Sequence, residues 1–163
     1  MRLLHGSYLD IERPDLQKCK SLNDFGRGFY LTPNWKRAWQ MAKRSAALHQ
    51  GKVTVNSFLF YPQVAQNKGL CIMEFDGFTP EWAKFVLCNR TSTDFKHGYD
   101  IVIGPVADAV VDQEIIQYKA LYGEGYLDDE NLRVFLARIS QFGYNYIQYC
   151  FCTQRAIDEL IKD

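Results

Sequence analysis

The sequence lacks any apolar segment long enough to cross a membrane, since a spanning helix needs about 18 or more consecutive apolar residues. Its first residues, Met1–Gly6, also lack the apolar stretch of about 7–15 residues that a secretory signal requires. The 19 basic and 19 acidic side chains cancel, which excludes a strongly cationic nucleic-acid binder held by charge alone. We therefore expect a cytoplasmic protein with no membrane partner.

Cysteines are few and follow no motif spacing. The five thiols include no CxxC pair, and an odd, scattered set in a chain without a signal indicates reduced thiols. Cys150 and Cys152 are two residues apart in an apolar stretch, which predicts that they share one face of a strand. Their neighbours supply no further soft ligand, so we expect packed core thiols and no metal.

The sequence also contains neither a GxGxxG string nor a P-loop, which disfavours Rossmann and P-loop architectures. It has no internal repeat and no Pro- or Gly-rich linker. With 163 residues, 47% hydrophobic and 23% charged, it suits a single domain over residues 1–163. Strands and helices interleave without the regular rhythm of a doubly wound sheet, so the expected fold class is α+β.

Periodicity and turn residues predict where the elements lie. Thr32 and Pro33 favour the start of a helix, as N-cap and first helical residue. The predicted strands cover residues 3–6, 29–31, 53–61, 69–75, 99–106 and 146–151. The predicted helices cover residues 34–49, 80–89, 112–122 and 129–141, with a last helix from Thr153 through Ile161.

The helix over residues 34–49 carries aromatic and basic residues together. Its tryptophans, Trp35 and Trp39, and Met41 are expected to pack the helix rather than to stack on a base. The pairs Lys36-Arg37 and Lys43-Arg44 are expected to form a solvated face, with a phosphate or nucleic-acid contact as the alternative.

Three short strings stand out, at residues 3–7, 26–32 and 146–151. In order and character they resemble the three motifs of the ADP-ribosyltransferase fold in its His-Tyr-Glu branch, which is related to poly-ADP-ribose polymerases and diphtheria toxin. That branch has a strand ending in His-Gly-Ser/Thr, a glycine-rich approach to a strand with a tyrosine, and a late strand with a glutamate. The whole chain is most similar to an uncharacterised bacterial domain family of that fold, through residues 23–32, 81–90 and 99–105.

The resemblance implies an ADP-ribosyltransferase-like split β-sheet core with flanking helices, NAD as co-substrate and no metal. The matching positions imply that His5 holds ribose hydroxyls and that the backbone of Gly6 hydrogen-bonds the nicotinamide carboxamide. They also imply that the Ser7 hydroxyl contributes to binding the same group. Tyr30 is implied to stack on the nicotinamide ring or to line the pocket that binds it.

The glycine-rich string is expected to meet the rest of the dinucleotide. Gly26 and Gly28 let the chain turn tightly beside the ligand. Arg27 is a candidate for a phosphate or adenosine contact, because its planar fork of donors suits phosphate oxygens.

Gln148 stands where the family carries its glutamate. Cleavage of the nicotinamide–ribose bond passes through an oxocarbenium-like state, which a carboxylate stabilises while it accepts a hydrogen bond from the ribose 2′-hydroxyl. Glutamine keeps the hydrogen bond and loses the charge, which disfavours polymer synthesis and strong glycohydrolase activity. We expect His5, Tyr30 and Gln148 to be the catalytic residues. Other acids are present, but no spacing singles one out: Asp24, Asp108, Asp112 and Glu114.

The resemblance implies an NAD-dependent mono-ADP-ribosyltransferase that passes ADP-ribose to a macromolecular acceptor, either protein or nucleic acid. It also implies a toxin with an antitoxin protein as partner. An NAD glycohydrolase and a non-catalytic module that binds NAD or ADP-ribosyl groups are the alternatives. The charge distribution fits an anionic ligand, since residues 1–50 hold 9 basic and 4 acidic side chains and residues 111–163 hold 5 and 9.

Overall fold

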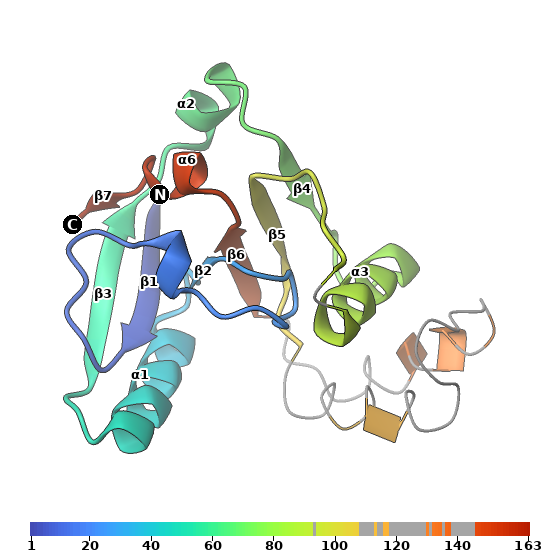
Figure 1. Cartoon of the computed structure of the whole chain (residues 1–163), viewed down its shortest axis with the longest axis horizontal. Helices are drawn as coiled ribbons and strands as arrows, with labels where there is room; N and C mark the ends of the chain where they lie inside the picture. The colour runs from blue at the N-terminus through green and yellow to red at the C-terminus, as the bar shows by residue number, and fades with distance from the viewer. Residues whose placement is uncertain are drawn as a thin grey trace.

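Two β-sheets with helices around them form an α+β fold, as predicted (Figure 1). The computed structural model describes residues 1–92, 94–107, 113, 116–117, 130, 132–134, 136–137 and 146–163. Within these ranges no helix is long and apolar enough to cross a membrane. The helices predicted over residues 112–122 and 129–141 lie largely outside the described residues.

The first sheet joins the two ends of the chain. Its antiparallel strands are β1 (Arg2–Ser7), β3 (Thr54–Leu59) and β7 (Ile161–Lys162), in the order β1-β3-β7. The prediction of a helix as far as Ile161 is wrong at its end, because α6 (Gln154–Ile157) is a single turn and Ile161 enters β7. Arg2 pairs with Asp163 at 2.6 Å, so the termini lie side by side (Figure 1).

The second sheet has the order β2-β6-β5-β4. Its strands are β2 (Phe29–Leu31), β6 (Ile147–Phe151), β5 (Ile101–Pro105) and β4 (Ile72–Glu74), with β4 parallel to β5 and the other pairs antiparallel. A bridge links the two sheets, in which Leu4 and Thr32 exchange N–H to C=O hydrogen bonds of 2.8 and 2.9 Å. The predicted strands are therefore present, but two separate sheets contain them.

Helix α1 (Trp35–His49) covers the first sheet (Figure 1). Its N-cap is Asn34, whose side chain accepts from the Arg37 N–H, and not Thr32 as predicted. Thr32 is instead held in the bridge to β1, with its hydroxyl donating to the Ile147 carbonyl. The buried residues of α1 recur every four positions and are all small: Ala38, Ala42 and Ala46.

Two apolar cores flank the second sheet. One lies between the sheets and joins Leu3, Phe29, Phe58 and Phe151 to α6 and to the short α2 (Pro62–Asn67). The other lies under α3 (Pro80–Thr91), which Thr79 and Pro80 begin as predicted. Alternate residues of β6 therefore face different cores, with Cys150 on the α3 side and Phe151 on the side of the first sheet.

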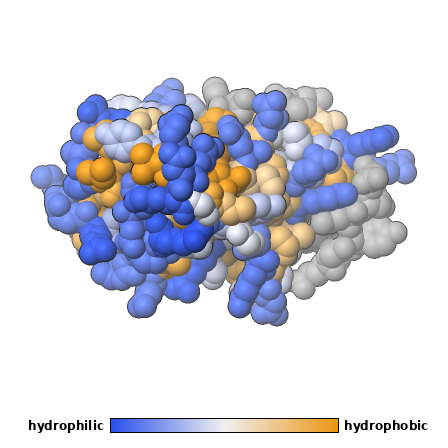
Figure 2. All heavy atoms as spheres, turned by 90° about the horizontal axis from the view of Figure 1, so that it is seen from above, coloured by the Kyte–Doolittle hydropathy of each residue, from blue (hydrophilic) through white to orange (hydrophobic). Residues whose placement is uncertain are grey.

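The face seen in Figure 2 is largely hydrophilic, with apolar groups between the hydrophilic ones. Figure 2 views the molecule from the end where α2 and α6 lie, and hydrophilic atoms border the apolar ones there.

The short η1 (Leu16–Lys18) leads from β1 toward the glycine-rich string. That string turns at Gly26, whose φ of 80° is a left-handed conformation that favours glycine.

The close approach of α1 to β1 makes Gly6 a stability determinant. A Cβ at Gly6 would overlap the Ala38 carbonyl oxygen and lie 2.5 Å from the Ala42 nitrogen. Because these are backbone atoms, the helix must move, and we expect Gly6→Ala to lower the free energy of unfolding by about 1–3 kcal/mol or more in urea titrations. Gly98→Ala is the matched control, since no atom lies within 4 Å of its added Cβ, and equal losses in both variants would contradict the packing.

Candidate functional site

A cavity of about 270 Å³ lies beside the bridge between β1 and β2. This volume is close to the lower limit of ordinary small-ligand pockets. The cavity is bordered by β1, β2, α1, α3 and the residues that follow β5. Its lining combines apolar atoms with a few polar groups: Leu4, His5, Gly6, Asn23, Asp24, Tyr30, Leu31, Thr32, Arg37, Ala38, Met41, Arg90, Val106, Ala107 and Gln148.

Gly6 presents its main chain to this cavity. Leu4 directs its N–H and C=O away from β3, toward Thr32. Backbone groups alternate in direction along a strand, so Gly6 directs its N–H and C=O the same way, beyond the end of the bridge. In the described residues neither group has a hydrogen-bond partner. The edge of β1 thus offers one donor and one acceptor at the cavity wall.

His5 is held in a defined tautomer. Its Nδ1 is 2.7 Å from the Tyr30 carbonyl oxygen, which only accepts, so Nδ1 must carry the proton and donate. Burial lowers the pKa of His5 below its ordinary value, with the hydrogen bond to Tyr30 acting in the opposite direction. At neutral pH the ring is therefore uncharged, and Nε2 is an acceptor for a hydroxyl group.

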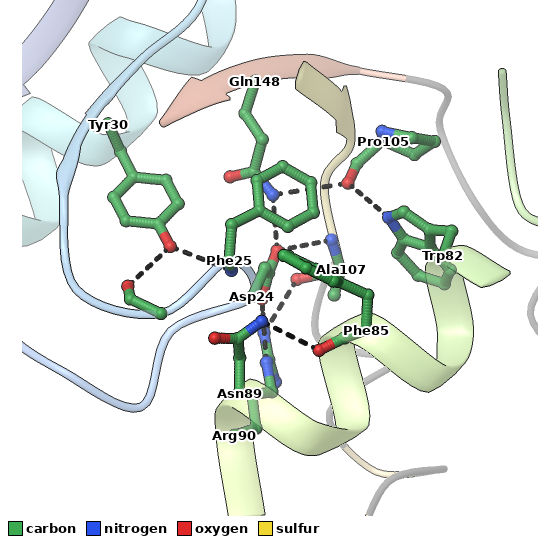
Figure 3. Close-up of polar contacts among 11 residues, drawn as sticks. Asp24, Phe25, Tyr30, Trp82, Phe85, Asn89, Arg90, Pro105, Ala107 and Gln148 are labelled. Carbon is green, nitrogen blue, oxygen red and sulfur yellow. Dashed lines mark hydrogen bonds and ion pairs between the residues drawn. The ribbon is translucent and has the colours of Figure 1, made fainter. Parts of the chain in front are cut away.

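Tyr30 contributes its ring rather than its hydroxyl. The hydroxyl donates to the Gly26 carbonyl at 2.8 Å and accepts from the Phe25 N–H at 2.9 Å (Figure 3). Burial raises the pKa of Tyr30 well above its ordinary value, so the phenol stays protonated. The hydroxyl therefore holds the glycine-rich turn, and Tyr30 is among the residues that line the cavity.

Gln148 lies at the base of the cavity, with its amide orientation fixed by acceptors. Its Nε2 donates to an Asp24 carboxylate oxygen at 2.6 Å and to the Pro105 carbonyl at 3.3 Å. The amide oxygen therefore points the other way (Figure 3). It has no partner in the described part of the chain, and the side chain lines the cavity. The site thus presents a neutral acceptor where the predicted family carries a carboxylate.

Asp24 is the acid that joins the walls of the cavity. Its carboxylate accepts from Arg90 of α3, from the Ala107 N–H at 2.8 Å and from Gln148 of β6 (Figure 3). Asp24 is buried, so these donors are needed to offset the loss of water around its charge. The sequence named Asp24 among several acids without distinguishing it, and the pairing with Arg90 across 66 positions has no local signal. Asp108, Asp112 and Glu114 lie outside the described residues.

Two arginines of the sequence analysis, Arg27 and Arg37, differ in their position relative to the cavity. Arg27 donates to the carbonyls of Cys19 at 3.2 Å and Gln17 at 2.8 Å, and it does not line the cavity. Arg37, in the first turns of α1, does line it, and its guanidinium has no ion pair among the described residues. Arg37 therefore brings a guanidinium group to the cavity lining without an ion-pair partner in the described part of the chain. The first Lys-Arg pair was the sequence signal for it.

Ser7 and Gly28 also lie outside the cavity lining. The Ser7 hydroxyl accepts from the Leu9 N–H at 3.1 Å, which shapes the turn after β1. Gly28 is required by packing, because a Cβ there would overlap the Cys150 sulfur and lie 2.8 Å from the Phe151 carbonyl oxygen. Both residues support the strands that form the cavity.

Cys150 and Cys152 share one face of the chain, as predicted, with their sulfur atoms 3.4 Å apart. Hydrogen bonds from Cys150 and His97 lower the pKa of Cys152, whereas burial raises the pKa of Cys150. Both thiols are free, and no group of three or more metal-ligating side chains occurs in the described residues.

Together these features define an α+β protein with a small-ligand cavity at the junction of two sheets. The chain belongs to the family described as "Protein of unknown function (DUF3990)", whose model matches residues 1–161. No curated protein and no solved structure matches the chain.

The contact between Gln148 and Asp24 predicts a pH-dependent cost for a glutamate at position 148. Burial and the nearby Asp24 would raise the pKa of that carboxyl above its unfolded value of about 4.3. A raised folded-state pKa means that stability is present at low pH and lost as pH rises through the folded-state pKa. We expect Gln148→Glu to lower the free energy of unfolding by about 3 kcal/mol at pH 7, and by clearly less at pH 5.

Urea titrations at both pH values measure this difference. Gln148→Met is the matched control, since it removes the hydrogen bonds without adding a titrating group, so its cost should be the same at pH 5 and pH 7. A Gln148→Glu cost that does not change with pH would contradict the arrangement.

Proposed function

We propose that the chain is an NAD-dependent mono-ADP-ribosyltransferase with a split-sheet ADP-ribosyltransferase core. It would cleave the nicotinamide–ribose bond and transfer ADP-ribose to a macromolecular acceptor. The observation that carries the proposal is the unpaired main chain of Gly6 at the cavity wall. A primary carboxamide has N–H donors and a carbonyl acceptor, which complement one backbone C=O and one backbone N–H.

The other groups around the cavity support the same ligand. The Tyr30 ring provides an aromatic face for the nicotinamide ring, and offset stacking is the favoured contact. The neutral Nε2 of His5 and the amide oxygen of Gln148 are two acceptors for ribose hydroxyls. Arg37 supplies positive charge for the diphosphate.

In the reaction the bond between the ribose C1′ and the nicotinamide nitrogen breaks, and its electron pair leaves with nicotinamide. The sugar then carries oxocarbenium-like positive charge. The Gln148 oxygen faces this charge, and the hydrogen bond from its N–H to Asp24 polarises the amide so that the oxygen becomes a better acceptor. The nucleophilic atom of the acceptor bonds to C1′ and gives up its proton. Water as the nucleophile would give the glycohydrolase reaction instead.

A non-catalytic module that binds NAD or ADP-ribosyl groups is the second candidate. The observation that favours it is the pairing of Asp24 with Arg90, because this pairing neutralises the buried carboxylate beside Gln148. An amide with a neutralised acid behind it holds a ribose hydroxyl but stabilises an oxocarbenium ion less than a free carboxylate does.

The test is incubation of the protein with labelled NAD, lysate and purified nucleic acid, with free nicotinamide and labelled macromolecules followed together. We expect labelled macromolecules and nicotinamide in equal amounts. Nicotinamide without label supports hydrolysis, and NAD binding without either product supports the non-catalytic module. The last two outcomes overturn the transferase proposal.

Two variant pairs connect the activity to the cavity. Gln148→Ala should lower kcat about 100-fold, whereas Ser7→Ala should leave it unchanged. Arg37→Ala should raise KM for NAD about tenfold or more, because it removes a charge-assisted contact, and Arg27→Ala should not. If Arg27→Ala raised KM and Arg37→Ala did not, the assignment of the diphosphate site would be wrong.

A further inference from the structure

Helix α1 carries a pair of tryptophans that the cavity does not use. Trp35 and Trp39 were expected to pack the helix, but their side chains are 59% and 41% exposed. They lie one turn apart with stacked rings, 6.3 Å between centroids and 17° between planes. By contrast, Trp82 in the core is fully buried. Exposing two large aromatic side chains to water without a partner is unfavourable, so they mark a binding surface.

The charges on α1 have one sign. The helix contains four Lys and Arg residues and no Asp or Glu: Lys36, Arg37, Lys43 and Arg44. Lys36, Lys43 and Arg44 are exposed, and no ion pair to them occurs in the described residues. In a chain with a net charge of zero, this helix is locally cationic and complements a polyanion.

The exposed residues form a continuous band around the helix. With about 100° per residue, Trp39 lies beside the alanine face, about 20° from Ala46, and Arg37 lies about 160° further around the helix. The outer surface between them passes Lys36 and Lys43, and then Arg44. Arg37 then reaches the cavity, which it lines together with Met41. The band therefore leads from the aromatic pair, across cations, to the cavity.

Other occupants fit this band less well. A dinucleotide in the cavity cannot cover the tryptophans. Trp35 and Trp39 each lie about 160° around α1 from Arg37, which lines the cavity. A membrane surface needs an amphipathic helix with a free apolar face, but the apolar face of α1 is already packed on β1 through Ala38, Ala42 and Ala46. Aromatic rings alternating with cations are the pattern that stacks bases and follows a phosphate backbone.

We propose that the outer face of α1 binds single-stranded nucleic acid, with bases stacked on Trp35 and Trp39 and phosphates along Lys36, Lys43 and Arg44. Single strands are favoured because their bases are free to stack on side chains, whereas the bases of a duplex stack on each other. That the bound strand is also the ADP-ribose acceptor rests on the proposed function, since the band ends at the cavity.

The binding is tested without NAD, by fluorescence anisotropy of a labelled 20-nucleotide single strand, of DNA and of RNA, and of the corresponding duplexes. We expect at least one single strand to bind more tightly than its duplex. The logarithm of the affinity should fall with that of the salt concentration with a slope of about −2, because three cations contact phosphates. Equal affinity for single strand and duplex, or no binding at low salt, overturns the proposal.

Variants locate the surface. Trp35→Ala/Trp39→Ala should weaken single-strand binding about tenfold or more, since each stacked base is lost with its ring. Tyr61→Ala is the matched control, because Tyr61 is a 49% exposed aromatic residue next to α2, at the other end of the molecule (Figure 1).

The cations are tested in the same way: Lys43→Glu should weaken binding of the single strand, and Lys18→Glu in η1 should not. Thermal unfolding of each variant confirms that it is folded, and equal effects in the test and control variants overturn the proposal.

Intrinsic fluorescence adds an independent readout. Two of the three tryptophans are exposed, so a bound single strand should quench much of the emission and protect it from acrylamide. Trp35→Ala/Trp39→Ala should retain only the emission of Trp82, which the strand does not change.

Failure of the proposed nucleic-acid surface can be distinguished from failure of the proposed transferase activity, because binding is measured without NAD. If lysate protein rather than nucleic acid becomes labelled, the transferase stands and the strand is not its acceptor.

Discussion

The buried carboxylate of Asp24 is the interaction on which the cavity depends. Four segments that are distant in the sequence meet there: the loop before Gly26, α3 through Arg90, the chain after β5 through Ala107, and β6 through Gln148. A buried charge is strongly unfavourable unless donors surround it, so each of these segments must be in place to offset the burial of the Asp24 carboxylate. The walls of the cavity are therefore coupled, and the position of one is fixed by the others.

This constraint also gives a physical reason for glutamine at position 148. Asp24 requires a donor from β6, and an amide supplies an N–H on one side while keeping a carbonyl oxygen on the other. A glutamate at the same place would bring a second negative charge within hydrogen-bond distance of Asp24. The negative charge in this part of the cavity wall is thus carried by Asp24, which pairs with Arg90. Glutamine at this position is compatible with a functional ribose contact and is not by itself a sign of lost function.

The fold class and most strand positions could be predicted from local patterns. His5, Gly6, Tyr30 and Gln148 were selected through the resemblance to a known family, and all four line one cavity. Strand alternation placed Cys150 and Cys152 on one face, and turn chemistry started α3 at Thr79. Long-range contacts could not be predicted: the bridge that withdraws Thr32 from the cap of α1, the pairing of Asp24 with Arg90, and the entry of Ile161 into β7. Nor does a short motif fix the direction of a long side chain, which is why Arg27 turned out to support η1 while Arg37 lines the cavity.

Gly6 connects the two proposals. Because it has no side chain, α1 can approach β1 until the Ala38 carbonyl occupies the space of a Cβ. That approach places Arg37 and Met41 at the cavity and sets the tryptophan pair and its cations on the outer surface of the same rigid helix. The main-chain groups of Gly6, meanwhile, have no partner within the part of the chain that the structure describes and lie at the edge of β1. A larger residue would displace the helix and with it both surfaces, so one position controls the cavity proposed to hold a dinucleotide and the surface proposed to bind nucleic acid.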